Sequence, residues 1–89
     1  MNDLYLPTLG QHLKAAKKKM FPQDDLAAFA LRVGVSRATY QKMEKGDLSV
    51  SLRHYHAAAK VLNLTGGFDK LFEREESLFD DWEKVRYLS

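Results

Sequence analysis

The chain has 89 residues, of which 45% are apolar and 29% charged, as in an ordinary soluble globular protein with one modest core. No apolar run approaches the roughly 20 residues that cross a bilayer, and the first residues lack the basic and apolar blocks of a secretory signal. The absence of cysteine excludes a disulfide framework and a thiolate metal site. We expect a cytoplasmic protein without a membrane partner.

The net charge of +2 is unevenly distributed along the chain. Residues 1–66 carry ten Lys or Arg against five Asp or Glu, a balance of +5, whereas residues 67–89 carry four against seven, a balance of −3. The basic segment 1–66 indicates a polyanionic partner, and the acidic segment 67–89 indicates a second, different partner. The alternative is a surface charge that is merely uneven.

Helical periodicity runs through almost the whole chain and predicts an all-α fold. Residues 1–7 are expected to form an N-terminal arm, extended at 4–6. A first helix should begin at a Thr8 cap and end at Phe21, before Pro22. Its inward side chains should be Leu9, Leu13, Ala16 and Met20.

Two further helices are expected on either side of a glycine turn. Asp24 and Asp25 should start the second, whose buried face carries Leu26, Phe29, Ala30 and Val33. Gly34 should end that helix in the left-handed conformation, and Ser36 should cap the third. The third helix should bury Tyr40 and Met43 and stop at Gly46.

The remaining elements complete a compact bundle of about five helices with an extra C-terminal helix. Ser51 should cap a fourth helix, closed by Asn63 or by Gly66 and Gly67. Its inward residues should be Leu52, Tyr55, Ala59 and Leu62. A short fifth helix over 68–72 should cover the bottom of the bundle with Leu71 and Phe72. Ser77 should open the last helix, which runs to about Tyr87.

The glycine turn and its surroundings resemble the lambda-repressor-like helix-turn-helix family, also called the xenobiotic-response-element type. The residues that carry the resemblance are Ala30, Gly34, Val35, Ser36, Thr39, Glu44, Gly46, Val50, Ser51 and Leu52. The resemblance covers residues 8–66 and implies a DNA-binding domain, usually of a homodimeric repressor. The chain departs from the family at 21–24, where it has extra residues, and at Leu26, where the family usually has a phosphate-contacting glutamine.

The third helix is the expected DNA reader, because the major groove admits a helix. The candidate base contacts are Arg37, Ala38, Gln41 and Lys42, which point away from the buried side. Arginine and lysine pair with guanine acceptors and glutamine with adenine, while Ala38 can touch a thymine methyl group. The alternative for each is a solvated polar face.

Phosphate contacts are expected from helix starts and flanking cations. The residues assigned to them are Gln23, Ser36, Thr39, Lys45, Ser51 and Arg53. In the family a basic residue of the first helix pairs with the glutamate before the final glycine, and here those positions are Lys17 and Glu44. The resemblance implies that this pair braces the recognition helix, with a lysine that cannot make the bidentate contact of an arginine.

Residues 67–89 are expected to form an acidic helical extension with an apolar stripe. The stripe consists of Leu78, Phe79, Trp82 and Val85. It can pack on the domain's own core, on a second copy of the chain or on a foreign protein. Trp82 is the best candidate anchor, because tryptophan is enriched at interface hot spots.

The sequence shows no catalytic constellation and no metal-binding pattern, so neither an enzyme nor a cofactor is predicted. We expect a sequence-specific regulator that binds double-stranded DNA, a homodimeric repressor reading an inverted-repeat operator through the helix at 36–45. One alternative is an antitoxin that represses its own operon and binds a toxin through the C-terminal segment. A second is a protein-interaction module that does not bind DNA.

Overall fold

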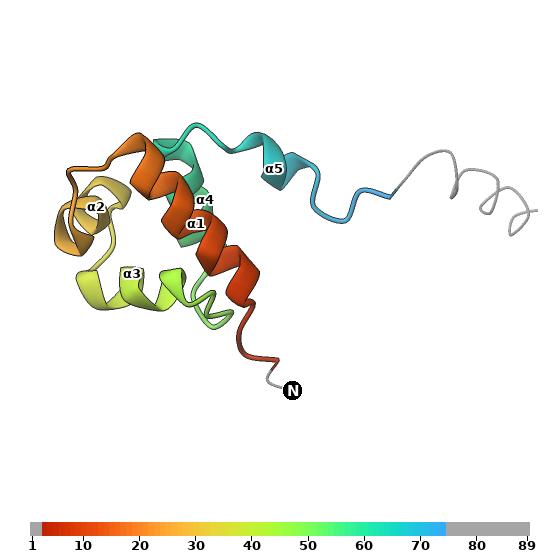
Figure 1. Ribbon diagram of the computed structural model, residues 1–89. Helices are drawn as coiled ribbons and strands as arrows, with labels where there is room; N and C mark the ends of the chain where they lie inside the picture. Colours follow the sequence, from red (N-terminus) through yellow and green to blue (C-terminus); the bar gives the residue numbers. More distant parts are fainter. Residues whose placement is uncertain (1–2, 75–89) are drawn as a thin grey trace, which may run out of the picture.

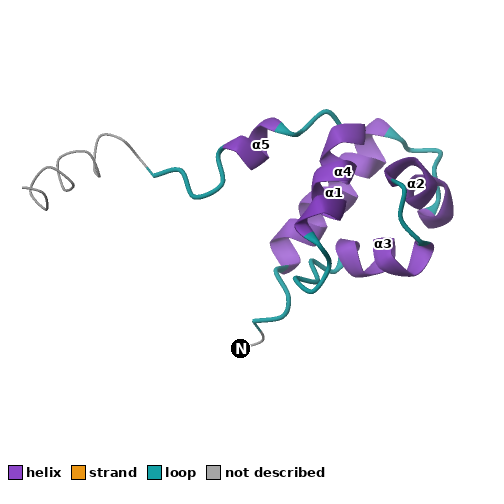
Figure 2. Cartoon of the chain, turned by 180° about the vertical axis from the view of Figure 1, so that it is seen from behind, coloured by secondary structure: helices purple, strands orange, loops and turns teal. Residues whose placement is uncertain are grey.

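A computed structural model describes residues 3–74 of the chain. This part of the chain forms five helices and no extended strand, which confirms the all-α prediction (Figures 1 and 2). The helices are α1 (Pro7–Met20), α2 (Leu26–Val33), α3 (Arg37–Glu44), α4 (Leu52–Val61) and α5 (Gly66–Asp69). The C-terminal helix predicted from Ser77 lies outside the described residues.

The core lies between the first four helices, since α1 packs on α3 and α2 packs on both α3 and α4. Phe29 of α2 and Tyr40 and Met43 of α3 are the largest completely buried side chains. Leu13 of α1, Tyr55 of α4 and Leu62, the C-cap of α4, belong to the same cluster. In Figures 1 and 2, α3 forms one edge of the bundle, and none of the other helices within residues 3–74 covers its outer side.

The N-terminal arm is fixed to the loop that follows α3. The backbone N–H of Leu6 donates to the Gly46 carbonyl at 2.8 Å, and that of Leu48 donates to the Leu4 carbonyl at 2.8 Å. Tyr5 and Asp47 thereby form an isolated antiparallel bridge. The extended conformation predicted at 4–6 is confirmed only at Tyr5, since Leu4 lies in a turn, and the bridge joins the arm to the end of α3.

Helix α1 begins earlier than predicted. The N-cap is Leu6, which makes no side-chain capping hydrogen bond, and Pro7 occupies the first turn, so the predicted Thr8 cap is wrong. The physical reason is that the fixed φ of proline suits the first helical position, where its missing N–H removes no hydrogen bond. Met20 is half exposed at the last helical position, so it does not extend the buried stripe.

Helices α4 and α5 also correct two expectations about the core. Leu52 is 60% exposed at the first position of α4, and Ala58 is buried instead, beside the correctly predicted Tyr55, Ala59 and Leu62. Helix α4 ends before Asn63, whose φ of 59° is left-handed, as predicted for one of the two stops.

The short fifth helix was predicted a few residues too late. Only Phe68 of α5 packs back on the bundle, with its ring 5.2 Å from that of His56. Leu71 and Phe72 follow the end of this helix, and Phe72 is 99% exposed. The chain leads away from the bundle at this point (Figure 1), so these two residues do not cover it.

Candidate nucleic-acid interface

The turn between α2 and α3 sets the position of the candidate recognition helix. The Asp25 carboxylate caps α2 by accepting the Ala28 N–H at 2.8 Å. Gly34 has a φ of 90°, and the N–H groups of Gly34 and Val35 both donate to the Ala30 carbonyl, at 2.9 and 3.1 Å. This is a left-handed glycine stop, and it allows α3 to begin three residues later.

Ser36 starts α3 as predicted. Its Oγ accepts the Thr39 N–H at 3.0 Å and its hydroxyl donates to the Thr39 Oγ1 at 3.0 Å. The N–H groups of Arg37 and Ala38 belong to the first turn of the helix and have no intrahelical acceptor. The start of α3 therefore presents backbone donors to an anion, a phosphate of DNA included.

The inner side of α3 is held rigidly. Tyr40 and Met43 are both 0% exposed, and the Tyr40 ring packs edge-on against Phe29 with 5.3 Å between ring centroids. Burial of two large side chains three residues apart fixes the rotation of the helix about its axis. The opposite side is consequently the one that α3 turns outward.

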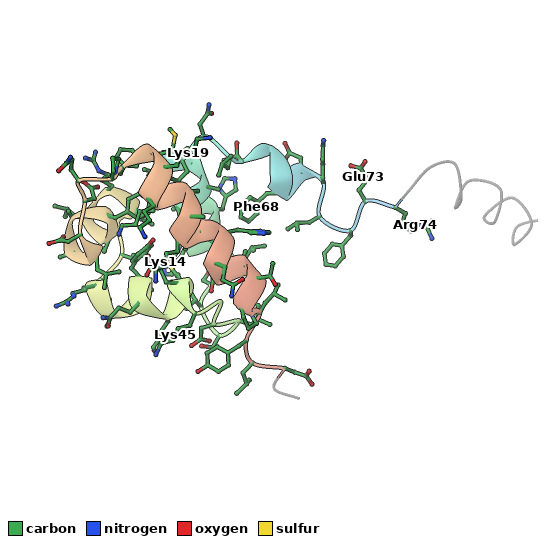
Figure 3. The ribbon with its side chains drawn as sticks, viewed as in Figure 1. Lys14, Lys19, Lys45, Phe68, Glu73 and Arg74 are labelled. Atoms are coloured by element: carbon green, nitrogen blue, oxygen red, sulfur yellow. The ribbon has the colours of Figure 1, made fainter. Side chains whose placement is uncertain are left out.

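All four predicted base-contacting residues lie on that outward side. Arg37, Ala38, Gln41 and Lys42 are exposed, and their spacings of one and four residues place them together along one strip of the helix. Lys45 is exposed just beyond the last turn and lies at the outer edge of α3 in Figure 3. The structure therefore brings these five side chains together on one open surface.

The other predicted phosphate contacts occupy flanking positions. Ser51 caps α4 by accepting the Arg53 N–H at 3.1 Å, and both residues are exposed. Gln23 is exposed in the turn before α2. Thr39 is only partly exposed because its hydroxyl lies against Ser36, although that hydroxyl retains a proton for another acceptor.

The two acidic residues of the segment 36–53 are turned inward. Asp47 is 8% exposed, and its carboxylate accepts the N–H of Ser49 at 2.8 Å and the Ser49 hydroxyl at 2.7 Å. These hydrogen bonds lower the pKa of Asp47 below its usual value. Glu44 is half-buried. The outer surface of this segment thus carries Arg37, Lys42, Lys45 and Arg53 without an exposed carboxylate.

The brace predicted between Lys17 and Glu44 does not form. Oε2 of Glu44 is buried without a hydrogen-bond partner. The Arg32 guanidinium lowers the pKa of the Asp24 carboxyl, and Lys17 makes a smaller contribution in the same direction. Asp24 belongs to the extra residues between α1 and α2, and its ion-pair partner is Arg32. Lys14, about one turn earlier on α1, lines the same depression as Glu44.

Close backbone packing holds α1 against α3 in place of that ion pair. A Cβ added to Gly10 would lie inside contact distance of the Glu44 carbonyl and 2.6 Å from the Gly46 nitrogen. Gly46 has a φ of 75°, and a Cβ there would overlap the Leu6 carbonyl. The sequence contained one usable signal for this contact, a glycine inside the helical pattern of α1.

A second structural contact that sequence reasoning missed orients α2. Arg32 makes a two-point ion pair with Asp24, and its guanidinium lies 4.3 Å from the Phe21 ring centroid. This arrangement fastens the turn before α2 to the end of the same helix. Arg32 is thereby engaged within the protein and is not added to the candidate DNA contacts.

The described part of the chain contains no group of three or more His, Cys, Asp or Glu side chains placed to hold a metal ion. Among the helices of residues 3–74, none has the length and apolar character required to cross a membrane. The predicted interface residues Leu78, Phe79, Trp82 and Val85 lie outside the described residues.

Comparison with known proteins identifies a family for the segment that contains α2, α3 and α4. A family model described as helix-turn-helix (HTH_3) matches residues 14–68, which include α2, α3 and α4 in full. Searches of curated proteins and of solved structures gave no match. The match covers more than half of the chain and contains the turn, the Ser36 cap and the exposed strip of α3. The chain belongs to the lambda-repressor-like helix-turn-helix family of DNA-binding regulators.

Proposed function

We propose that the protein is a sequence-specific transcriptional repressor, acting in the cytoplasm, that inserts α3 into the major groove of double-stranded DNA. The observation that supports this most strongly is the exposed strip of Arg37, Ala38, Gln41 and Lys42 on a helix whose opposite side is completely buried. The buried side fixes the direction of the strip, so its side chains reach base edges without reorganisation of the fold.

Each member of the strip has a role that follows from its chemistry. Arg37 and Lys42 donate to the O6 and N7 acceptors of guanine, and Gln41 pairs with adenine. Ala38 allows close approach of the helix and contacts a thymine methyl group. Ser36 and the free N–H groups at the start of α3 bind one phosphate, with Thr39 and Lys45 beside them.

The flanking elements fix the register on the duplex. Ser51 and Arg53 at the start of α4 bind the backbone on one side, and Gln23 before α2 binds it on the other, in place of the family's glutamine. Such contacts carry no sequence information, but they position the reading helix.

We further propose that two copies bind an inverted repeat. A homodimer places its two recognition helices about one turn of DNA apart, roughly 34 Å, in successive major grooves. The two half-sites must then be related by the same two-fold symmetry as the protein.

The test compares Arg37→Ala with Arg53→Ala on the preferred duplex and on duplexes altered at one base pair. Arg37→Ala should cost about 1–3 kcal/mol on the preferred site and relax the preference at one position, because it removes a base contact. Arg53→Ala should weaken binding equally on all duplexes, because it removes a phosphate contact. An equal loss on every duplex for Arg37→Ala would overturn its assignment as a base reader.

A second candidate is an antitoxin that represses its own operon and binds a toxin through residues 67–89. The support for it is the balance of −3 in that segment beside a body of +5, together with Trp82 in an apolar stripe. Trp82→Ala would then abolish co-purification of the toxin while leaving DNA affinity unchanged. A module that binds only protein is the remaining alternative, and any salt-sensitive preference for one duplex would eliminate it.

A further inference from the structure

The N-terminal arm lies at the same edge of the bundle as the exposed strip of α3. In Figures 1 and 2, residues 3–6 extend beyond the lower edge of the bundle, which is the edge that α3 forms. Two backbone hydrogen bonds hold the arm to the loop that follows α3, one on either side of the pair Tyr5 and Asp47. Tyr5 and Asp47 therefore form a non-hydrogen-bonded antiparallel pair, whose side chains lie close together on one face.

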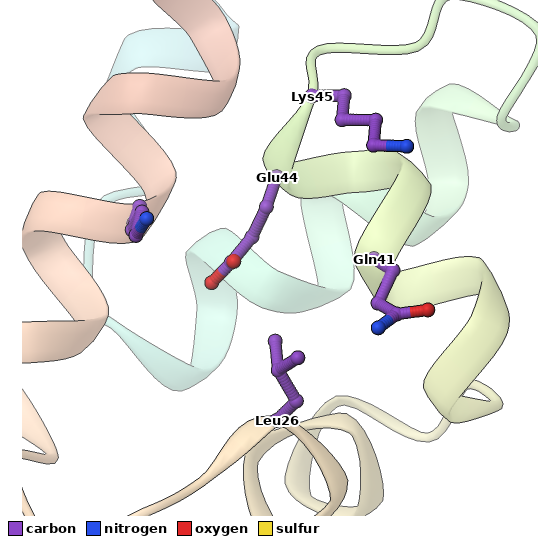
Figure 4. Close-up of a pocket in the computed structure, with 5 residues that line it drawn as sticks. Leu26, Gln41, Glu44 and Lys45 are labelled. Carbon is purple, nitrogen blue, oxygen red and sulfur yellow. The ribbon is translucent and has the colours of Figure 1, made fainter.

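The face that Tyr5 shares with Asp47 adjoins the cations at the end of α3. Hydrogen bonds to its carboxylate are the main cause that lowers the pKa of Asp47, and the charges of Lys42 and Lys45 lower it further. Figure 4 shows Lys45 extending away from α1, whereas Glu44 extends toward α1. Tyr5 is itself 38% exposed. Its side chain therefore lies beside the C-terminal half of the exposed strip, where solvent or DNA can reach it.

The loop after α3 has no backbone donor left for a phosphate. Each N–H group from Lys45 to Val50 donates to an acceptor within the protein. The Ser49 hydroxyl is also engaged, because it donates to the Asp47 carboxylate. The side-chain donors that remain beside this loop are Lys45 and the Tyr5 hydroxyl, which makes no hydrogen bond within residues 3–74.

We propose that Tyr5 is a further DNA contact, whose hydroxyl donates a hydrogen bond to a backbone phosphate beside the C-terminal end of α3. Tyrosine is among the residues that contact DNA phosphates, and such a contact positions the protein without reading sequence. Asp3, exposed two residues earlier, carries a charge that phosphate repels, so the contribution of the arm is a neutral donor. This inference rests on the proposed binding of DNA and adds a phosphate contact to it.

The test compares the unaltered chain with Tyr5→Phe, which keeps the ring and removes only the hydroxyl, on the duplex selected from a random library. We expect binding to weaken about 3–10-fold, and equally on duplexes altered at one base pair. The slope of log affinity against log salt concentration should stay unchanged, because the hydroxyl carries no charge. Lys45→Met, which removes a cation, should instead make that slope shallower by about one.

Duplexes in which one phosphate is replaced by a neutral methylphosphonate locate the contact. One such replacement should weaken binding of the unaltered chain and have no effect on Tyr5→Phe, because the two changes remove the same hydrogen bond. Tyr55→Phe, which removes a buried hydroxyl that donates to the Asp47 carbonyl, is the control for effects through stability and should bind every duplex like the unaltered chain.

The possible failures of the two proposals are distinguishable. Equal affinities of Tyr5→Phe and the unaltered chain for the selected duplex would overturn the assignment of Tyr5 and leave the proposed repressor function intact. A changed base preference in Tyr5→Phe, or a loss that no single methylphosphonate reproduces, would also overturn it. An unaltered chain that selects no duplex would overturn both proposals.

Discussion

The contact between the arm and the end of α3 predicts a large difference between two glycine substitutions. Gly34 and Gly46 both have a positive φ, 90° and 75°, so alanine at either position incurs the left-handed penalty of about 1–2 kcal/mol. Reduced entropy of the unfolded chain offsets roughly 0.4–1 kcal/mol of it. The two sites differ in the room they offer to a side chain. A Cβ added at Gly34 would have no atom within 4 Å.

At Gly46 the added Cβ overlaps the Leu6 carbonyl, so the arm must move away. The movement breaks the 2.8 Å hydrogen bonds from Leu6 to Gly46 and from Leu48 to Leu4, each contributing about 0.5–1.5 kcal/mol. We therefore expect Gly34→Ala to lower the free energy of unfolding by about 1 kcal/mol and Gly46→Ala by about 2–4 kcal/mol.

Urea denaturation of both variants measures the two free energies directly, provided that the slopes stay equal. A loss at Gly46 within about 0.5 kcal/mol of the loss at Gly34 would refute the reasoning, because the arm would then contribute nothing beyond the backbone term.

Three smaller predictions concern residues that support α3 and the loop after it. Ser36→Ala should lower the free energy of unfolding by about 1 kcal/mol, since the cap on the Thr39 N–H is lost, and an unchanged urea midpoint would contradict this. Tyr55→Phe removes the 2.6 Å hydrogen bond to the Asp47 carbonyl and should cost about 1–3 kcal/mol in thermal unfolding, without altering base preference. Hydrogen bonds from Ser49 keep the folded pKa of Asp47 below 3.8, so its stabilisation is complete above that pH and is lost as pH falls through the lower folded value. Below pH 4, the melting temperature of Asp47→Asn should therefore fall less steeply with decreasing pH than that of the unaltered chain. Equal slopes of melting temperature against pH for the two proteins would contradict this prediction.

The local elements of the fold were predictable because their signals lie within a few residues. Asp25, Gly34 and Ser36 each act through their own backbone or that of a residue no more than four positions away. The burial of Tyr40 and Met43 followed from helical spacing together with the polarity of their neighbours. The same reasoning placed the exposed strip of α3, which is the candidate site.

The errors arose where the outcome depends on distant partners. The face of Leu52 depends on how α4 meets the bundle, and its place at the first turn leaves it in solvent. The surroundings of Glu44 depend on how α1 lies against α3, and Lys14 rather than Lys17 lines the same depression as Glu44. Gly10 is needed because the end of α3 touches α1, a contact between residues far apart in sequence. Periodicity within one helix carries no information about such contacts.

The most direct test of the central claim is selection of binding sites from a random duplex library by the full chain, at two salt concentrations. Exposed cations on a rigidly held α3 predict one enriched inverted repeat, bound with an affinity that falls steeply as salt rises. Arg37→Ala should enrich the same repeat with one position relaxed. Failure to enrich any duplex at low salt would contradict the assignment of α3 as a reading helix.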